Sequence, residues 1–189
     1  MGDAEYRHRR NENLFESIKG ETRAFSGKVF AVDVLDIEQT GGRMGKREVV
    51  RHSGGAAILP LDRDGNVYLV RQFRTPFMRV TAEIPAGKLE PGEDPREAAI
   101  RELSEETGII AESVVDLGTM YPTPGYCGEI LYLFLATDLR WEESHPDPDE
   151  EVEVLKIPLA DLLRKIEKNE IHDAKTVIAI LKTARRMHL

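Results

Sequence analysis

A dense run of acidic residues inside a predicted helix constrains this chain more than any other feature. Residues 87–110 read GKLEPGEDPREAAIRELSEETGII, and the first twenty of them include six glutamates and one aspartate. Asp94 is a favourable N-cap, Pro95 suits the first helical position and Gly108 is a natural C-terminal stop. The sequence therefore predicts a helix from about Pro95 to Thr107.

The two faces of this helix differ in character. At about 100° per residue, Ala99 and Leu103 share an apolar face that can pack on a sheet, while Glu102, Glu105 and Glu106 occupy a separate arc. Like charges at these spacings cost about 0.2–0.5 kcal/mol per pair. One interpretation is a solvated helix face. The other is a set of hard oxygen ligands for Mg²⁺ or Mn²⁺ on one rigid surface.

The same stretch resembles the Nudix box, G-x5-E-x7-R-E-U-x-E-E-x-G-U, in which U is apolar. Every fixed position is present: Gly87, Glu93, Arg101, Glu102, Leu103, Glu105, Glu106, Gly108 and Ile109. Five further segments resemble the bacterial ADP-ribose pyrophosphatases of this family: KREVVRH, VRQFR, EIPAGKLE, PTPGYCGE and HDAKTVIAI. The resemblance therefore extends over nearly the whole chain.

The resemblance implies an α/β fold, the Nudix-type α/β/α sandwich with a mixed sheet, preceded by an N-terminal antiparallel β arm. We expect the arm over residues 1–52 and the Nudix hydrolase domain over residues 53–189. Strand-like runs at 28–37 and 46–52 would form the arm. A turn signal at Asp64-Gly65 predicts a hairpin across 54–74. In the family the arm is exchanged across a homodimer.

The resemblance also implies Mg²⁺-dependent hydrolysis of ADP-ribose to AMP and ribose 5-phosphate, with Mn²⁺ as a substitute. Glu102 and Glu106 correspond to metal ligands, Glu105 assists them, and the carbonyl of Ala86 completes the metal site. A metal suits this chemistry, because it cancels charge on the diphosphate and acidifies the attacking water. Arg101 and Glu93 are expected to pair and to fix the loop against the helix.

Four other residues match substrate-binding positions of the family. Arg47 corresponds to an arginine that reaches the neighbouring subunit's nucleotide site, and Arg74 corresponds to a diphosphate contact, for which a guanidinium is well shaped. Glu83 and Glu129 match carboxylates near the metal and the ribose. A surface salt bridge is the alternative role for each of the four.

The acidic loop PDPDEEVEV departs from the family pattern. The general base usually lies in this loop, but Pro148 occupies a position where glutamate is common. Glu150 is the first candidate for the base and for a further metal ligand, and Asp149 is the second candidate. A solvated acidic loop is the alternative, in which case Glu105 or Glu129 becomes the next residue to test as the base.

The charge and the composition exclude several classes of protein. The net charge of −8 argues against general binding to nucleic acid or to an anionic membrane. No apolar run is long enough to span a bilayer. A single cysteine, Cys127, allows no internal disulfide and fits the reducing cytoplasm.

Two alternatives to ADP-ribose hydrolysis stay open. The substrate could be another nucleoside diphosphate sugar or another ADP-linked compound. The chain could also be a non-catalytic module that senses ADP-ribose. Such sensors tend to have a degenerate box, and because the box is intact here, the sequence favours an enzyme.

Overall fold

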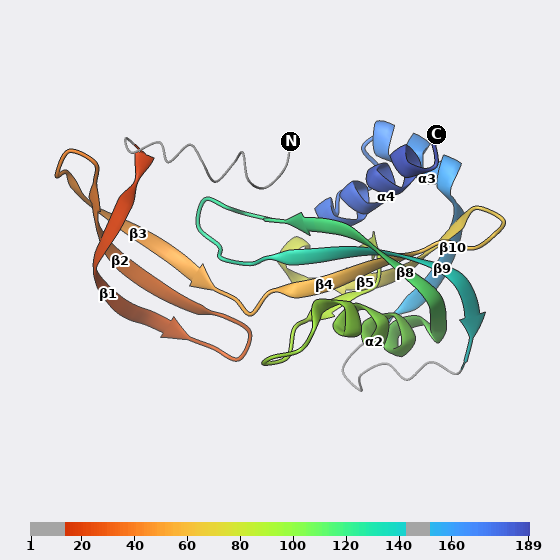
Figure 1. Cartoon of the computed structure of the whole chain (residues 1–189), viewed down its shortest axis with the longest axis horizontal. Helices are drawn as coiled ribbons and strands as arrows, with labels where there is room; N and C mark the ends of the chain where they lie inside the picture. The colour runs from red at the N-terminus through yellow and green to blue at the C-terminus, as the bar shows by residue number, and fades with distance from the viewer. Residues whose placement is uncertain (1–13, 143–151) are drawn as a thin grey trace. The chain divides into compact units, whose positions relative to one another are not determined.

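The computed structural model describes residues 14–142 and 152–189, which divide into two compact units (Figure 1). The first unit takes the described chain up to His52 together with Thr123–Gly128. The second takes Ser53–Pro122 and the described chain from Glu129 onward. None of the helices in these ranges is long and apolar enough to cross a membrane.

The first unit is built on a three-stranded antiparallel sheet. Its strands are β1 (Glu16–Ser26), β2 (Ala31–Gln39) and β3 (Met44–Arg51), in that spatial order. The sequence predicted β2 and β3 but missed β1. The segment ESIKGETRAFS lacks an alternating apolar pattern, and its pairing with β2 shifts register twice. The buried residues of this sheet alternate along β2 and are Asp33, Leu35 and Ile37.

The second unit contains two sheets. One has the order β7-β4-β9-β8 and pairs β4 with β9 in parallel, and the other has the order β10-β5-β6 and is antiparallel. In chain order the strands are β4 (Gly55–Pro60), β5 (Asn66–Arg74), β6 (Arg79–Glu83), β7 (Ala86–Lys88), β8 (Ile109–Met120), β9 (Leu131–Trp141) and β10 (Glu153–Pro158).

The predicted hairpin across 54–74 is wrong, although the turn at Asp64-Gly65 forms. A single bridge, Leu61 to Val67, joins the two sides of the turn. β4 is already paired on both edges, with β7 and with β9, so β5 has no free edge of β4 to join. β5 pairs instead with β10 and β6 in the other sheet.

Helices cover both faces of the four-stranded sheet (Figure 1). The helix α2 (Pro95–Thr107) packs on one face, and α3 (Leu159–Glu167) with α4 (Ala174–Arg186) covers the other. A short 3₁₀ turn, η2 (Thr75–Phe77), links β5 to β6. This layering confirms the predicted α/β/α sandwich with a mixed sheet.

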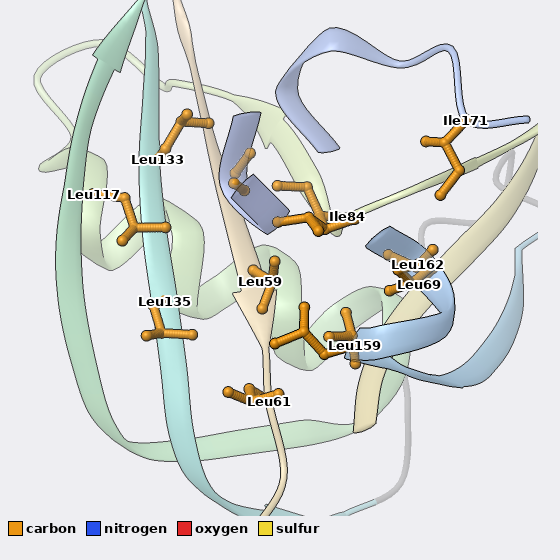
Figure 2. Packing of buried hydrophobic residues seen from close by; sticks show 14 residues of the cluster. Leu59, Leu61, Leu69, Ile84, Leu117, Leu133, Leu135, Leu159, Leu162 and Ile171 are labelled. Atoms are coloured by element: carbon orange, nitrogen blue, oxygen red, sulfur yellow. The ribbon is translucent and has the colours of Figure 1, made fainter. Parts of the chain in front are cut away.

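Alternate residues of β4 supply the two cores. Ala56 and Ile58 pack with α2, whereas Ala57 and Leu59 pack on the side of α3 and α4. All four are fully buried. Figure 2 shows the second of these cores, in which Leu59 lies among leucine and isoleucine side chains from both sheets and α3. The strand is therefore fixed on both faces, as expected for the centre of a sandwich.

Candidate active site

The acidic helix begins and ends as the sequence predicted. The side chain of Asp94 accepts hydrogen bonds from the amides of Arg96 (2.9 Å) and Glu97 (3.3 Å). At the other end, Gly108 adopts φ 69°, a left-handed conformation that favours glycine, and its amide donates to Ser104 O at 2.8 Å. The buried Leu103 holds the helix on the sheet. These contacts fix the direction in which its glutamates project.

Gly87 allows the helix to approach β7 closely. A Cβ atom at Gly87 would lie only 1.7 Å from Oε1 of Glu102, so the carboxylate packs directly against the backbone of β7. Ala86, whose carbonyl is a predicted ligand, is the neighbouring residue. A carboxylate and a peptide carbonyl held at one place are the hard oxygen donors that Mg²⁺, Mn²⁺ and Ca²⁺ prefer. The glycine cradle therefore fits the divalent cation that the sequence implies.

Arg101 organises the other charges of the helix. Its Nε and Nη2 donate to the two oxygens of Glu93 at 3.0 and 3.2 Å, as predicted for this pair. Its Nη1 donates to Glu102 and Glu105, each at 2.9 Å. The hydrogen bonds to Glu93, together with the charge of Glu102, raise the pKa of Arg101. Arg101 therefore stays charged and offsets the repulsion between the two box carboxylates.

No ready-made cluster of three or more His, Cys, Asp or Glu side chains for a metal occurs within residues 14–142 and 152–189. Arg101 forms ion pairs with both Glu102 and Glu105. Glu106 is 5% exposed and lies on the buried side of the acidic arc. The donor chemistry and the close approach at Gly87 fit a metal site that shares its carboxylates with Arg101.

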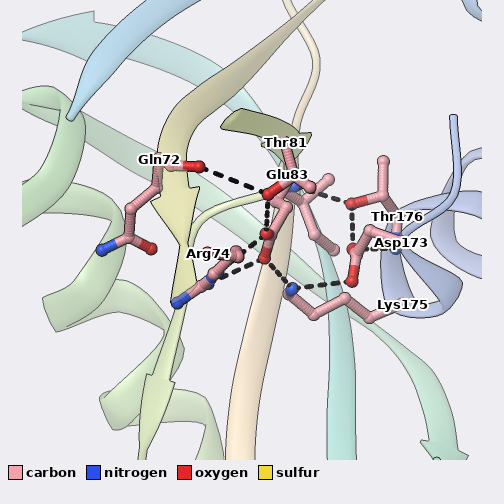
Figure 3. Close-up of polar contacts among 8 residues, drawn as sticks. Gln72, Arg74, Thr81, Glu83, Asp173, Lys175 and Thr176 are labelled. Carbon is pink, nitrogen blue, oxygen red and sulfur yellow. Dashed lines mark hydrogen bonds and ion pairs between the residues drawn. The ribbon is translucent and has the colours of Figure 1, made fainter. Parts of the chain in front are cut away.

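Glu83 is the centre of a second polar group (Figure 3). Nε and Nη2 of Arg74 donate to its two oxygens, each at 2.8 Å, and Thr81 Oγ1 donates to Oε1 at 2.5 Å. Lys175 Nζ donates to Oε2 as well. Burial raises the pKa of Glu83, but the bonds from Arg74 and the charge of Lys175 outweigh it and hold that pKa well below its usual range. Glu83 is therefore a buried carboxylate that stays ionised.

The N-terminus of α4 anchors this group, and the sequence did not predict its role. Asp173 caps the helix by accepting from the Thr176 amide at 3.0 Å, and it accepts from Lys175 Nζ at 3.0 Å. Thr176 Oγ1 donates to Asp173 at 2.5 Å and accepts from the Ile84 amide at 2.8 Å. A signal was available: Lys175 lies four residues before the apolar Ala179 on a helical pattern, and a lysine on a buried face requires a carboxylate partner.

Arg74 is also affected by charges beyond its bond to Glu83. The hydrogen bond to Glu83 raises the pKa of Arg74, and the nearby charges of Asp173 and Glu106 act in the same direction. Arg74 thus lies within range of a box glutamate from α2 and of carboxylates from β6 and the start of α4. Among the predicted residues, direct contacts join Arg74 to Glu83 and place the Glu102 carboxylate against Gly87, next to Ala86. Arg101 links Glu102 to Glu105.

The other predicted residues have separate surroundings. Arg47 lies on β3 of the first unit, where its Nε donates to Glu16 at 3.0 Å. Glu129 is half-buried and lies two residues before β9. Glu150 and Asp149, the candidates for the base, lie outside the described residues.

A cavity of about 370 Å³ lies elsewhere in the second unit, between β8 and the C-terminal half of α4. It contains none of the predicted site residues. Its lining residues are Asp116, Leu117, Leu181, Lys182, Arg185 and Arg186. The candidate active site is therefore assigned to the box glutamates of α2 and the polar residues around Glu83, and not to this cavity.

Comparison with known proteins gives a consistent family. The NUDIX domain model matches residues 51–179. An ADP-ribose pyrophosphatase from Bacillus subtilis (strain 168) is 43% identical over 171 residues, which is 89% of this chain and 92% of that protein. The methanol dehydrogenase activator of Bacillus methanolicus is 42% identical and covers 88% of this chain and 92% of that protein.

More distant relatives widen the range of named substrates. A GDP-mannose pyrophosphatase from Cronobacter sakazakii (strain ATCC BAA-894) is 36% identical over 146 residues, covering 71% of this chain and 75% of that protein. Among solved structures, an ADP compounds hydrolase superposes with a TM-score of 0.82 and 24% identity, covering 93% of this chain and 96% of the other. At that identity the superposition supports the fold alone.

Proposed function

This chain belongs to the Nudix family, and on that premise we propose that it is a hydrolase that cleaves the diphosphate of ADP-ribose to give AMP and ribose 5-phosphate. The observation that carries the proposal is the arrangement around α2. Glu102 packs against Gly87, and Glu106 lies within electrostatic range of Arg74. These contacts support a single site with carboxylates for a cation and a guanidinium for phosphate oxygens.

Membership of this family implies dependence on a divalent cation. We propose Mg²⁺, with Mn²⁺ as a substitute, held by Glu102, Glu105, Glu106 and the carbonyl of Ala86. When bound there, the metal neutralises charge on the diphosphate and lowers the pKa of the water that attacks it. The arrangement of oxygen donors at a rigid helix supports this choice.

The protein side chains orient the diphosphate. Arg74 presents a planar fork that matches two phosphate oxygens, and its charge attracts the anionic group. In the described structure the two oxygens of Glu83 accept hydrogen bonds from this fork. Glu83 and Glu129 are proposed to lie near the metal and the ribose of the substrate. Arg101 keeps Glu102 and Glu105 in place for their ligand role.

The general base is proposed on sequence grounds to be Glu150, with Asp149 second and Glu105 next. We expect Glu150→Gln to lower kcat by about 10²–10⁴-fold with a smaller effect on KM, because loss of a positioned base affects the chemical step. Asp149→Asn should have a smaller effect. Steady-state kinetics of both variants and of the double variant test this assignment. If all three stay within about threefold of the parent, the base lies elsewhere, and Glu105 or Glu129 is tested next.

The assembly is proposed to be a homodimer in which the arm of residues 1–52 is exchanged and Arg47 contacts the partner's nucleotide. The resemblance of KREVVRH to the family supports this, as does a guanidinium already placed on β3 by its bond to Glu16. The core domain is proposed to span residues 53–189. The cytoplasm is the proposed compartment, since the single Cys127 suits a reducing environment.

A panel of nucleoside diphosphate compounds tests the proposed substrate. We expect kcat/KM for ADP-ribose to exceed that for GDP-mannose and for other ADP-linked compounds. GDP-mannose is the second candidate, because relatives with that named activity match most of this chain. A higher kcat/KM for GDP-mannose would replace ADP-ribose in the proposal. Binding of ADP-ribose without any product would favour the sensor alternative.

A further inference from the structure

Lys175 has no assigned part in the proposed chemistry, yet it is one of the few buried charged residues of the described chain. Its side chain is 10% exposed, and it donates hydrogen bonds to both Glu83 and Asp173. Together with Arg74 these residues form a balanced set of two cations and two carboxylates. We call Arg74, Glu83, Asp173 and Lys175 the Glu83 cluster (Figure 3).

The two cations of the Glu83 cluster differ in their freedom to move. The side chain of Arg74 is 39% exposed, whereas that of Lys175 is 10% exposed. Arg74 belongs to the end of β5, next to the η2 turn. Lys175 belongs to the first turn of α4, which Asp173 caps and which Thr176 ties to the Ile84 amide. The exposed cation can therefore turn toward a ligand, and the buried one stays with Glu83.

We propose that Lys175 is a positioning residue that keeps Glu83 paired and in place when Arg74 turns from Glu83 toward the diphosphate. This inference rests on the proposed function, because it requires a diphosphate at Arg74. Arg74 holds Glu83 through the same bidentate geometry that recognises phosphate oxygens. The substrate and Glu83 therefore compete for one guanidinium.

The competition explains why a second cation is needed. A carboxylate as buried as Glu83, whose side chain is 5% exposed, cannot lose its only charged partner without a large desolvation penalty. If Arg74 were that only partner, the penalty would oppose substrate binding. Lys175 remains bonded to Oε2, and Thr81 remains bonded to Oε1, so Glu83 is still satisfied after Arg74 has turned. Lys175 thereby makes Arg74 available to the substrate.

A merely structural ion pair is the alternative role for Lys175. It would join α4 to β6 and affect stability without affecting substrate affinity. The two roles separate in the variant Lys175→Gln, which keeps a donor for Glu83 and Asp173 but removes the charge. Lys175→Arg restores the charge. Lys182→Met is a matched control. Lys182 lies on the same helix, but it donates to the Leu117 carbonyl and lines the cavity between β8 and α4.

The test measures binding of α,β-methylene ADP-ribose, in which a methylene replaces the scissile bridge, by calorimetry with Mg²⁺, alongside kcat, KM and Tm. We expect Lys175→Gln to raise Kd for the analogue and KM for ADP-ribose by about tenfold, with a smaller change in kcat. Lys175→Arg should stay close to the parent, and Lys182→Met should leave Kd unchanged. In the Glu83→Gln background, Lys175→Gln should change Kd by less than about twofold, because no charged carboxylate then competes for Arg74.

The outcomes that overturn the inference are distinct from failure of the proposed function. A parent that neither binds the analogue nor cleaves ADP-ribose overturns both. An active parent whose Lys175→Gln variant has a lower Tm but unchanged Kd and KM overturns the positioning role alone. If Lys175→Gln does not fold, the double variant Glu83→Gln/Lys175→Gln removes both charges and decides through its comparison with Glu83→Gln. An affinity difference between them above about twofold contradicts the proposed coupling.

Discussion

Single residues decide how closely the carboxylates of this site meet the backbone. Gly87 could be recognised from the sequence as part of the box, but its physical role emerges only in three dimensions, where Glu102 occupies the space of a Cβ. The pairing of Arg101 with Glu93 was expected from the resemblance to the box and is confirmed. Lys175 could not be paired with Glu83, since the two are 92 positions apart and no local pattern joins them.

Gly87→Ala should weaken metal binding while leaving the fold intact. The added methyl group displaces the Glu102 carboxylate, which is the end of a flexible side chain and can move. We expect the apparent Kd for Mn²⁺, measured by calorimetry, to rise by about tenfold. Gly125→Ala is the control, because a Cβ there would meet no atom within 4 Å. Equal Mn²⁺ affinity in Gly87→Ala and the parent would contradict a role for Glu102 at the metal.

Glu106→Gln should lower turnover of ADP-ribose by about 10²-fold or more, because a proposed metal ligand is lost. Tm should stay close to that of the parent, since glutamine nearly matches glutamate in side-chain volume at this buried position. Glu97→Gln is the matched control, an exposed glutamate on the same helix at a position that the box leaves unspecified. Parent-like kcat in Glu106→Gln would exclude this carboxylate from the chemistry.

At the scale of elements, the sequence predicted what local signals specify. The ends of α2 follow from Asp94 and Gly108, and its apolar face follows from helical periodicity. The pairing of strands that are distant in the sequence was harder to predict than the ends of α2. The hairpin prediction failed because both edges of β4 are taken by β7 and β9. β1 was missed because it is a polar outer strand of its sheet, and only partners in β2 reveal it.

The arm sheet depends on a buried carboxylate, and its stability should depend on pH. The side chain of Asp33 is 1% exposed, and hydrogen bonds from Arg23 and Arg51 lower its pKa to about 2. A lowered pKa contributes stability that is fully present above the usual value of 3.8 and is lost as the pH falls toward 2. Asp33→Asn should therefore speed exchange of the β1–β3 amides most at neutral pH.

Hydrogen exchange with mass spectrometry on the parent and Asp33→Asn checks this at matched pH values. The difference in amide exchange rate between the parent and Asp33→Asn should be constant from neutral pH down to about 4 and should shrink below that value. If the difference in exchange rate is as large at about pH 2 as at neutral pH, Asp33 stabilises the sheet without its charge.

At the scale of the whole molecule, the chain consists of two compact units, of which the first contains the arm strands. In the proposed dimer, Arg47 from the arm of one subunit completes the active site of its partner. Mixing two inactive variants tests this. Subunits with Arg47→Ala and subunits with Glu106→Gln should each be inactive alone. In a two-fold dimer with Arg47 acting across subunits, a random equal mixture should regain about a quarter of the parent's activity. No recovery from mixtures shown to contain heterodimers would contradict action across subunits.

The carboxylates of α2 are proposed to hold a divalent cation, and Arg74 the diphosphate, while water cleaves ADP-ribose. The most direct measurement is ³¹P NMR of ADP-ribose with the purified protein, before and after addition of Mg²⁺. Without Mg²⁺ we expect an unchanged diphosphate. With Mg²⁺ we expect both diphosphate resonances to disappear and two phosphomonoesters, AMP and ribose 5-phosphate, to appear in equal amounts. Diphosphate resonances that persist with Mg²⁺, while ADP-ribose is bound, would contradict the proposal.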